Sequence, residues 1–216
     1  MLLSPGSARW PHLADDLAVF QAMLDVEIGW VRVQARLGVI DEELVADVAA
    51  HGDATDFDLA PVEAGVEAGG NPVIPMLAAL RSAVGSETRA AAAVHRGLTS
   101  QDVLDSALML LARRSLDIVA DRLRAAADAS AGLADTHRGT LLVARTLSQP
   151  ALPTTFGAKC AGWLAALDEA RAEVAAVARN LPVQCGGAAG TLAAIEQVAP
   201  GRSLQAADLL AEELGL

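Results

Sequence analysis

Apolar residues recur at three- and four-residue steps along much of the chain, which is the period of a helix with one buried face. The first such stretch runs from Asp15 to Leu37 and stops at Gly38. The longest opens at Thr99 and continues to about Asp135 without a proline. About 35 residues at ~1.5 Å each give a helix of roughly 50 Å, too long to bury its apolar stripe inside one small globule. We therefore expect a helical bundle that is completed by other subunits.

Further helices are expected over residues 41–51, 74–84, 154–180 and 203–214. Two intervening stretches are interpreted as irregular because glycine and proline punctuate them. Residues 52–72 are rich in Gly, Asp and Pro and are expected to form a loop, whereas residues 182–190 form a glycine-rich interruption. The pattern predicts two domains, an N-terminal helical domain over 1–94 and a central long-helix bundle domain over 95–216.

Composition supports an all-α fold. Hydrophobic residues make up 53% of the chain, but aromatic residues only 3%, and there is no tyrosine. The core must therefore be built mainly from Ala, Leu and Val, and Ala and Leu are strong helix formers. The two cysteines, Cys160 and Cys185, have no CxxC spacing and are interpreted as buried thiols rather than as zinc ligands or disulfides.

The charge balance narrows the class of partner. The chain carries 16 Lys+Arg against 27 Asp+Glu, a net charge of −11, which disfavours nucleic acid and anionic membrane surfaces as partners. No apolar run approaches the ~20 residues that a membrane span needs, and no signal peptide is evident near the start. We expect a cytoplasmic protein that binds a small molecule through local donors, with no metal and no organic cofactor.

Three polar segments do not fit an ordinary bundle. The first, His95-Arg-Gly-Leu-Thr-Ser-Gln-Asp102, puts hydroxyls and an amide where the longest helix starts. Backbone N–H groups and the positive end of the helix dipole converge there, which suits a carboxylate ligand. Thr99 and Asp102 also match the pattern of a helix-capping box, so the same residues are consistent with a purely structural helix start.

The second polar segment is Arg145-Thr-Leu-Ser-Gln-Pro-Ala-Leu-Pro-Thr-Thr-Phe-Gly157. A polar connection between two apolar helices is costly unless it binds something, but it is equally consistent with a turn capped by Thr154. The third is Gln184-Cys-Gly-Gly-Ala-Ala-Gly-Thr191, whose small residues allow a ligand to approach the backbone. It lacks the Gly-Lys-Ser/Thr of a phosphate loop, and a structural turn is the alternative interpretation.

Together, the three segments resemble the signature regions of the fumarase/aspartase superfamily of all-helical enzymes. His95-x-Gly-x-Thr-Ser-x-Asp102 is similar to its first region, and Arg145-Thr-x-x-Gln149 with Ala151, Pro153, Thr155 and Gly157 to its second. Gly186-Gly-Ala-Ala-Gly-Thr191 follows at the family's spacing. The resemblance covers nearly the whole chain, including the opening Leu2-Leu-Ser-Pro5.

Within the superfamily, the resemblance is closest to the 3-carboxy-cis,cis-muconate cycloisomerase branch. Adenylosuccinate lyases usually carry a catalytic histidine directly after the Arg-Thr of the second region, and here that position is Leu147. Cycloisomerases carry an apolar residue there. The stretch Gly157-Ala-Lys-Cys-Ala-Gly-Trp-Leu164 is also similar to that branch.

The resemblance implies a cofactor-free lactonisation of a small polycarboxylate in aromatic catabolism, the protocatechuate branch of the β-ketoadipate pathway. It also implies a homotetramer whose active sites are shared between subunits. The family's third signature, a flexible Gly-Ser-Ser-x-x-Met-Pro-x-Lys loop with a catalytic serine, does not occur in this sequence. We therefore expect an N-terminal part of a longer enzyme, inactive alone.

The resemblance also implies roles for individual residues. We expect His95, Ser100, Thr146 and Gln149 to be catalytic, with His95 orienting substrate or sharing in proton transfer. The expected substrate-binding residues are Asn71, Thr99, Gln101, Arg145 and Gly187. Two other classes of function stay open: an adenylosuccinate lyase-like or other fumarate-yielding lyase of the same fold, and a non-catalytic helical assembly module.

Overall fold

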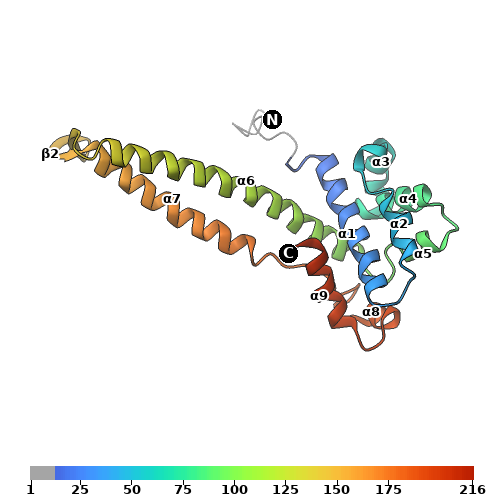
Figure 1. Ribbon diagram of the computed structural model, residues 1–216. Coiled ribbons are helices and arrows are strands. Elements are labelled where there is room, and N and C mark those ends of the chain that lie inside the picture. The colour runs from blue at the N-terminus through green and yellow to red at the C-terminus, as the bar shows by residue number, and fades with distance from the viewer. Residues whose placement is uncertain (1–12) are drawn as a thin grey trace. The chain divides into compact units, whose positions relative to one another are not determined.

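The structure is a computed structural model that describes residues 13–216 (Figure 1). These residues are mostly helical, which confirms the expected all-α fold class. The opening Leu2–Pro5 stretch lies outside the described residues. The chain forms two compact units, one made of the residues up to Arg113 together with Leu181–Leu216 and the other of Arg114–Asn180. A division between residues 94 and 95 stays a prediction.

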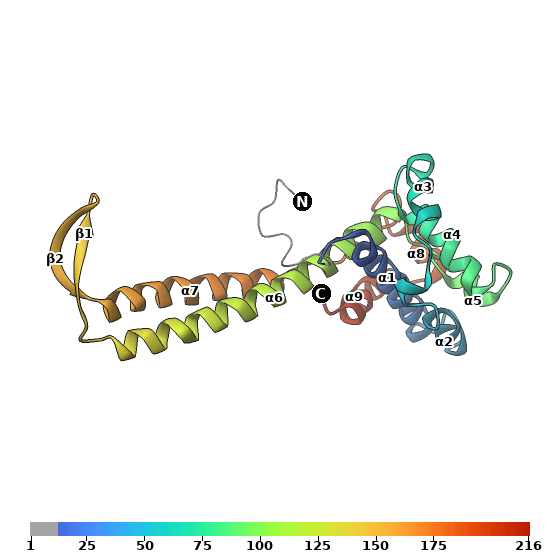
Figure 2. The same cartoon turned by 90° about the horizontal axis from the view of Figure 1, so that it is seen from above.

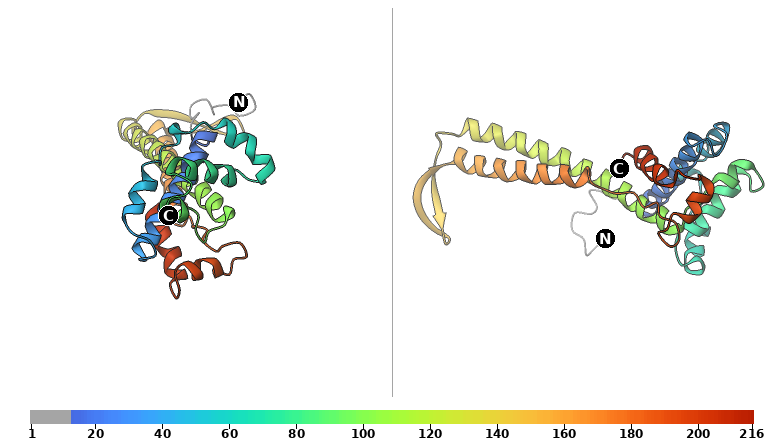
Figure 3. Two further views of the ribbon diagram at one scale, coloured as in Figure 1. Left: turned by 90° about the vertical axis from the view of Figure 1, so that its right-hand side faces the viewer. Right: turned by 90° about the horizontal axis from the view of Figure 1, so that it is seen from below.

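The first unit is built around one helix, α1. Its elements are α1 (Asp16–Arg36), α2 (Glu43–Ala49), the 3-10 helix η2 (Ala54–Asp56), α3 (Ala60–Gly69), α4 (Val73–Val84), α5 (Arg89–Ala93), the start of α6 (Ser100–Thr136), α8 (Ala193–Val198) and α9 (Ser203–Leu214). α1 lies against α2 and α9, and the views in Figures 1 and 3 show α9 alongside it. The C-terminal segment therefore packs onto the first long helix.

Most side chains of α1 between Phe20 and Gln34 are buried, whereas Arg32 and Arg36 are exposed. One apolar cluster includes Phe20, Met23 and Val31 with residues of α4, α5 and α6, and a second joins Trp30 and Val33 to residues of α8 and α9. Apolar contacts with two separate clusters place the middle of this helix inside the core of the unit. The Asp15 carboxylate accepts the Ala18 N–H at 2.9 Å to cap its start. Its end before Gly38, with φ 65°, confirms the predicted helix.

The loop expected over residues 52–72 is wrong in part, because Ala60–Gly69 forms α3. Pro61 lies in the first turn of α3, where a missing backbone N–H costs no hydrogen bond. Val62 of α3 is buried in the first apolar cluster. Tertiary packing thus supports a helix that its glycines and proline did not suggest.

The second unit is a pair of helices joined by a β-hairpin. Residues 114–136 of α6 and α7 (Phe156–Ala178) run side by side, and β1 (Leu141–Thr146) and β2 (Gln149–Thr155) lie at their shared end (Figures 2 and 3). The strands pair antiparallel, and Thr146 opposite Gln149 closes a two-residue turn. The hairpin is a correction, because a capped turn was the structural alternative expected here. Thr155, not Thr154, caps α7 by accepting the Ala158 N–H at 3.1 Å.

Across residues 13–216, no helix has both the length and the apolar character that a membrane crossing requires.

We expect Gly157→Ala to destabilise the second unit, because a Cβ there would lie 2.6 Å from the carbonyl oxygen of Ala134 and 2.7 Å from the backbone of Arg138. Overpacking of this kind costs roughly 1–3 kcal/mol, and it should appear as a lower free energy of unfolding in a denaturant titration. Gly162→Ala on the same helix is the control, because no atom lies within 4 Å of its added methyl. It should stabilise the helix by about 0.5–1 kcal/mol. Equal effects of the two variants would contradict the steric explanation.

Candidate active site

Three side chains of α1 hold the segment of residues 93–96 that follows α5. Gln34 donates from Nε2 to the carbonyl of Ala93 at 2.8 Å, and Trp30 donates from Nε1 to the carbonyl of Arg96 at 2.8 Å. The third is Glu27, whose partner is His95. Positions 27, 30 and 34 recur at three- and four-residue steps, so these side chains share one face of the helix. The sequence did not single out any of the three.

His95 takes a backbone conformation that is uncommon for a residue with a side chain, with φ 62°. Its backbone N–H donates to Glu27 Oε2 at 2.8 Å, and its ring Nδ1 lies 2.7 Å from Glu27 Oε1. The Glu27 side chain is fully buried, whereas that of His95 is 15% exposed. The ring therefore reaches the surface of the unit while its inner nitrogen meets a buried carboxylate.

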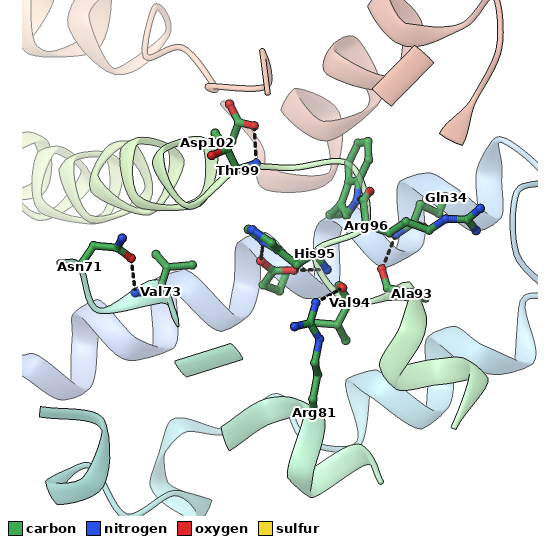
Figure 4. Close-up of polar contacts among 12 residues, drawn as sticks. Gln34, Asn71, Val73, Arg81, Ala93, Val94, His95, Arg96, Thr99 and Asp102 are labelled. Carbon is green, nitrogen blue, oxygen red and sulfur yellow. Dashed lines mark hydrogen bonds and ion pairs between the residues drawn. The ribbon is translucent and has the colours of Figure 1, made fainter. Parts of the chain in front are cut away.

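α4 holds the same segment from another side. Arg81 donates from its guanidinium to the carbonyl of Val94 at 2.9 Å (Figure 4). Charged donors make stronger hydrogen bonds than neutral ones, so this contact helps to fix the carbonyl of Val94. Consecutive residues from Ala93 to Arg96 thus each bind a side chain of α1 or α4.

The start of α6 has the predicted capping box. Asp102, the third helical residue, reaches back and accepts the Thr99 N–H at 2.9 Å (Figure 4). The first N–H groups of a helix have no partner inside it. In the described part of the chain, the N–H groups of Ser100 and Gln101 have no acceptor, so they can bind an anion. The Gln101 side chain is exposed and donates to Asp105 at 2.6 Å.

Asp102 joins the first and third motifs. Its carboxylate accepts the Gly186 N–H at 2.9 Å and the Gly187 N–H at 3.0 Å, and its side chain is fully buried. One turn further along, the hydroxyl of Ser106 accepts the N–H of Gln184 at 2.9 Å. Because the Gly187 N–H is bound to Asp102, it is not free to hold a substrate. Gly187 has φ 73°, a conformation that glycine adopts without strain.

Cys185 lies between these contacts. Burial, and then the negative charge of Asp102, raise the pKa of its thiol to about 12. The thiol therefore stays protonated across the neutral pH range, which agrees with its interpretation as an inert core residue. Cys160 is also buried and free. Among residues 13–216, no three His, Cys, Asp or Glu side chains form a group that could hold a metal ion.

Asn71, a predicted substrate-binding residue, is engaged at the start of α4. Its Oδ1 accepts the Val73 N–H at 3.0 Å, and its Nδ2 lies 3.5 Å from the carbonyl of Gly69 (Figure 4). Such a side-chain turn is a common way to open a helix. The amide N–H₂ therefore keeps donor capacity, although the carbonyl oxygen is used.

The remaining predicted site residues lie in the second unit. Arg145 and Thr146 end β1, Gln149 opens β2, and all three are exposed in this chain. The turn between them consists of Leu147 and Ser148, with φ 44° and 63°. The hairpin thus presents the polar residues of the second motif at its tip, in a different unit from His95 and Ser100.

Two buried carboxylates are the residues whose roles the sequence did not reveal. Glu27 is flanked by the apolar residues Val26 and Ile28, but Asp25 and Arg32 lie on the same helix, so the sequence does not mark it as the buried charge. The capping contact of Asp102 with Thr99 was predicted, but its other partners, Gly186 and Gly187, lie more than 80 residues away along the chain, so no local pattern predicts them.

We expect Asp102→Asn to destabilise the first unit, because an amide cannot accept three backbone N–H groups as a carboxylate does. Hydrogen bonds to charged groups contribute about 1.5–3 kcal/mol each, so the loss should be roughly 3–5 kcal/mol in the free energy of unfolding. Asp105→Asn, one turn along the same helix, is the control and should change it by less than about 0.5 kcal/mol. If the control is as damaging as Asp102→Asn, general helix charge explains the effect.

The chain is similar to a set of characterised and solved proteins. A family model described as a lyase matches residues 27–214. The nitrosuccinate lyase of Streptomyces davaonensis is 44% identical over 98% of this chain and 45% of its own length. The 3-carboxy-cis,cis-muconate cycloisomerase of Bradyrhizobium diazoefficiens is 40% identical over 100% of this chain and 48% of its own.

Among solved structures, the 3-carboxy-cis,cis-muconate lactonizing enzyme of Pseudomonas putida has a TM-score of 0.85 and is 33% identical. The match covers 99% of this chain and 48% of that one. The chain thus spans about half the length of the curated relatives it matches. Because the family model covers most of its residues and the helices superpose on a solved member, the chain belongs to the lyase family of the fumarase/aspartase superfamily.

Proposed function

We propose that the whole protein is a 3-carboxy-cis,cis-muconate cycloisomerase, a cofactor-free cytoplasmic enzyme of aromatic catabolism. The observation that carries the proposal is Leu147 at the tip of the hairpin. Its side chain is 98% exposed and can neither give nor take a proton, where adenylosuccinate lyases usually carry a catalytic histidine. The cycloisomerase relative at 40% identity over the whole chain supports it further.

The proposed reaction is an intramolecular addition. An oxygen of one substrate carboxylate attacks a carbon of the conjugated diene, and a proton is delivered to the neighbouring carbon. In reverse, it is a β-elimination with a carboxylate as leaving group, which is why a lyase scaffold suits it. The intermediate is an aci-carboxylate, so catalysis depends on donors that are already in place where negative charge develops.

The start of α6 supplies such donors in this proposal. The N–H groups of Ser100 and Gln101 and the hydroxyls of Thr99 and Ser100 would bind one substrate carboxylate. The guanidinium of Arg145 and the side chains of Thr146 and Gln149 would bind another. The N–H₂ of Asn71 and the ring of His95 would complete the contacts. Gly187 would contribute small size rather than its N–H, which Asp102 already accepts.

We also propose a homotetramer with active sites shared between subunits. The hairpin exposes apolar side chains that water disfavours, with Leu141 82%, Leu147 98% and Leu152 79% exposed in the single chain. Neighbouring subunits would cover them and bring the second motif to the first. A full-length protein that sediments as a monomer would contradict this part of the proposal.

A second candidate is elimination from nitrosuccinate, favoured by the 44% identity to a nitrosuccinate lyase. The two reactions share the aci-carboxylate intermediate and differ in the leaving group. An apolar residue at position 147 is compatible with both. A substrate assay therefore distinguishes the two candidate functions, because the position of the motifs is the same for both.

We expect the full-length protein to abolish the ultraviolet absorbance of the diene in 3-carboxy-cis,cis-muconate, with a lactone as product. Nitrosuccinate, followed by nitrite release, and adenylosuccinate, followed by fumarate formation, are assayed alongside. Turnover of nitrosuccinate without diene loss would assign the second candidate, and cleavage of adenylosuccinate would mean that Leu147 does not mark the branch.

We expect Ser100→Ala and Gln149→Ala to lower kcat/KM on the accepted substrate by about 10²–10³-fold, the usual cost of removing a donor to developing negative charge. Ser86→Ala and Gln205→Ala are matched controls on exposed side chains of the first unit and should leave kcat/KM unchanged. Full activity in either of the first two variants would remove that residue from the proposed site.

A further inference from the structure

Glu27 is a buried carboxylate to which the proposed reaction assigns no role. It lies in the middle of α1, and its side chain has no exposure. Moving a carboxylate out of water is costly unless hydrogen bonds or an opposite charge compensate it. Both hydrogen bonds that the structure gives this carboxylate go to one residue, His95.

Glu27 is not the only side chain that holds the backbone around His95. Gln34, Arg81 and Trp30 already hold the carbonyls of Ala93, Val94 and Arg96 (Figure 4). What only Glu27 does is to contact the imidazole ring, at 2.7 Å from Nδ1.

That contact decides which ring nitrogen carries the proton. A carboxylate accepts hydrogen bonds and does not donate them, so the proton of the neutral ring lies on Nδ1. Nε2 is then the nitrogen left for other partners, and a protonated ring donates its second proton from Nε2 alone. The side chain of His95 is 15% exposed, so the ring is accessible to a small molecule.

We propose that Glu27 is a positioning residue that keeps the proton on Nδ1 of His95, so that the ring exchanges protons with substrate through Nε2. The proton exchange between His95 and substrate rests on the proposed function, whereas the placement of the proton on Nδ1 does not. In the lactonisation direction, the protonated ring gives its Nε2 proton to the carbon beside the new C–O bond. The electrons of the N–H bond stay on Nε2, and the ring becomes the neutral Nδ1–H form that Glu27 stabilises. In the reverse direction, the lone pair of Nε2 takes the proton back.

The substitution Glu27→Gln separates shape from proton placement. Its amide oxygen can still accept the His95 N–H, but its N–H₂ then faces Nδ1 and donates to it. The neutral ring must move its proton to Nε2, although the side chain keeps its size. In a serine protease, replacing the aspartate of the catalytic triad with asparagine leaves the geometry intact. The histidine is then held in the wrong tautomer, and kcat falls about 10⁴-fold.

The test is ¹⁵N magic-angle-spinning NMR of the full-length protein with labelled histidine, recorded at alkaline pH above the ordinary titration range of histidine. His95→Gln identifies the signals of His95. We expect the Nδ1–H tautomer in the wild type and the Nε2–H tautomer in Glu27→Gln. Gln34→Ala, which loses the contact to Ala93 but not to the ring, should keep the wild-type tautomer. The same tautomer in the wild type and Glu27→Gln would overturn the inference.

Kinetics on the accepted substrate give the second measurement. We expect Glu27→Gln to lower kcat by about 10²–10⁴-fold, the usual contribution of general acid–base catalysis, with KM changed only a few-fold. Glu27→Asp keeps an acceptor for Nδ1 at a longer reach and should recover part of kcat. If Glu27→Gln fails to fold, the tautomer is compared between the wild type and Glu27→Asp. An Nδ1–H tautomer in both proteins supports the inference, and loss of that tautomer in Glu27→Asp overturns it.

The two proposals fail in different ways. A protein that turns over none of the three substrates contradicts the proposed function, yet the tautomer experiment still decides whether Glu27 places the proton. Conversely, full activity in a Glu27→Gln protein that has switched tautomer would show that His95 exchanges no proton with substrate, and would overturn the inference alone.

Discussion

Burial of most of α1 between Phe20 and Gln34 is the constraint on which the first unit depends. A polar side chain on the buried part of this helix must pair with a specific group, because no water is available there to satisfy it. Glu27, Trp30 and Gln34 meet this requirement through the segment of residues 93–96. The path of that segment, and with it the entry into α6, is therefore set by the polar groups of α1 rather than by the segment's own sequence.

The second buried carboxylate extends this arrangement to the glycine-rich segment. Asp102 accepts N–H groups from Thr99, Gly186 and Gly187, so it fixes both the start of α6 and the approach of a chain segment from near the C-terminal end. Gly97 has φ 91°, and a Cβ there would come within 3.1 Å of the Val198 side chain. Close approach of neighbouring chain segments thus explains glycine at position 97, as it does at position 157 of the second motif.

Long helices were predictable from the sequence, whereas their partners were not. α1, α6 and α9 begin and end within about two residues of expectation, because a regular apolar period and flanking caps define them locally. The hairpin escaped prediction because prolines lie in β2 and because Leu147 and Ser148 replace the glycine or asparagine typical of a two-residue turn. The motifs of the candidate site were found from the sequence. The contacts of Glu27 with His95 and of Asp102 with Gly186 were not, because they join residues 68 and 84 positions apart.

The proposed substrate carries several carboxylates, and the chain has a net charge of −11, so the overall field opposes binding. Local donors must outweigh that repulsion, and the contacts of Asp102 reduce their number, since the N–H groups of Gly186 and Gly187 are already occupied. Donors of the first unit that could bind an anion include the free N–H groups of the α6 start, the hydroxyls of Thr99 and Ser100, the N–H₂ of Asn71, and Nε2 of His95 when the ring is protonated. A carboxylate behind Nδ1 makes the protonated ring a balanced ion pair rather than an isolated cation. The buried Glu27 thus adds a negative charge to an acidic protein, but it pairs with Nδ1 of His95 and leaves Nε2 for a polycarboxylate ligand.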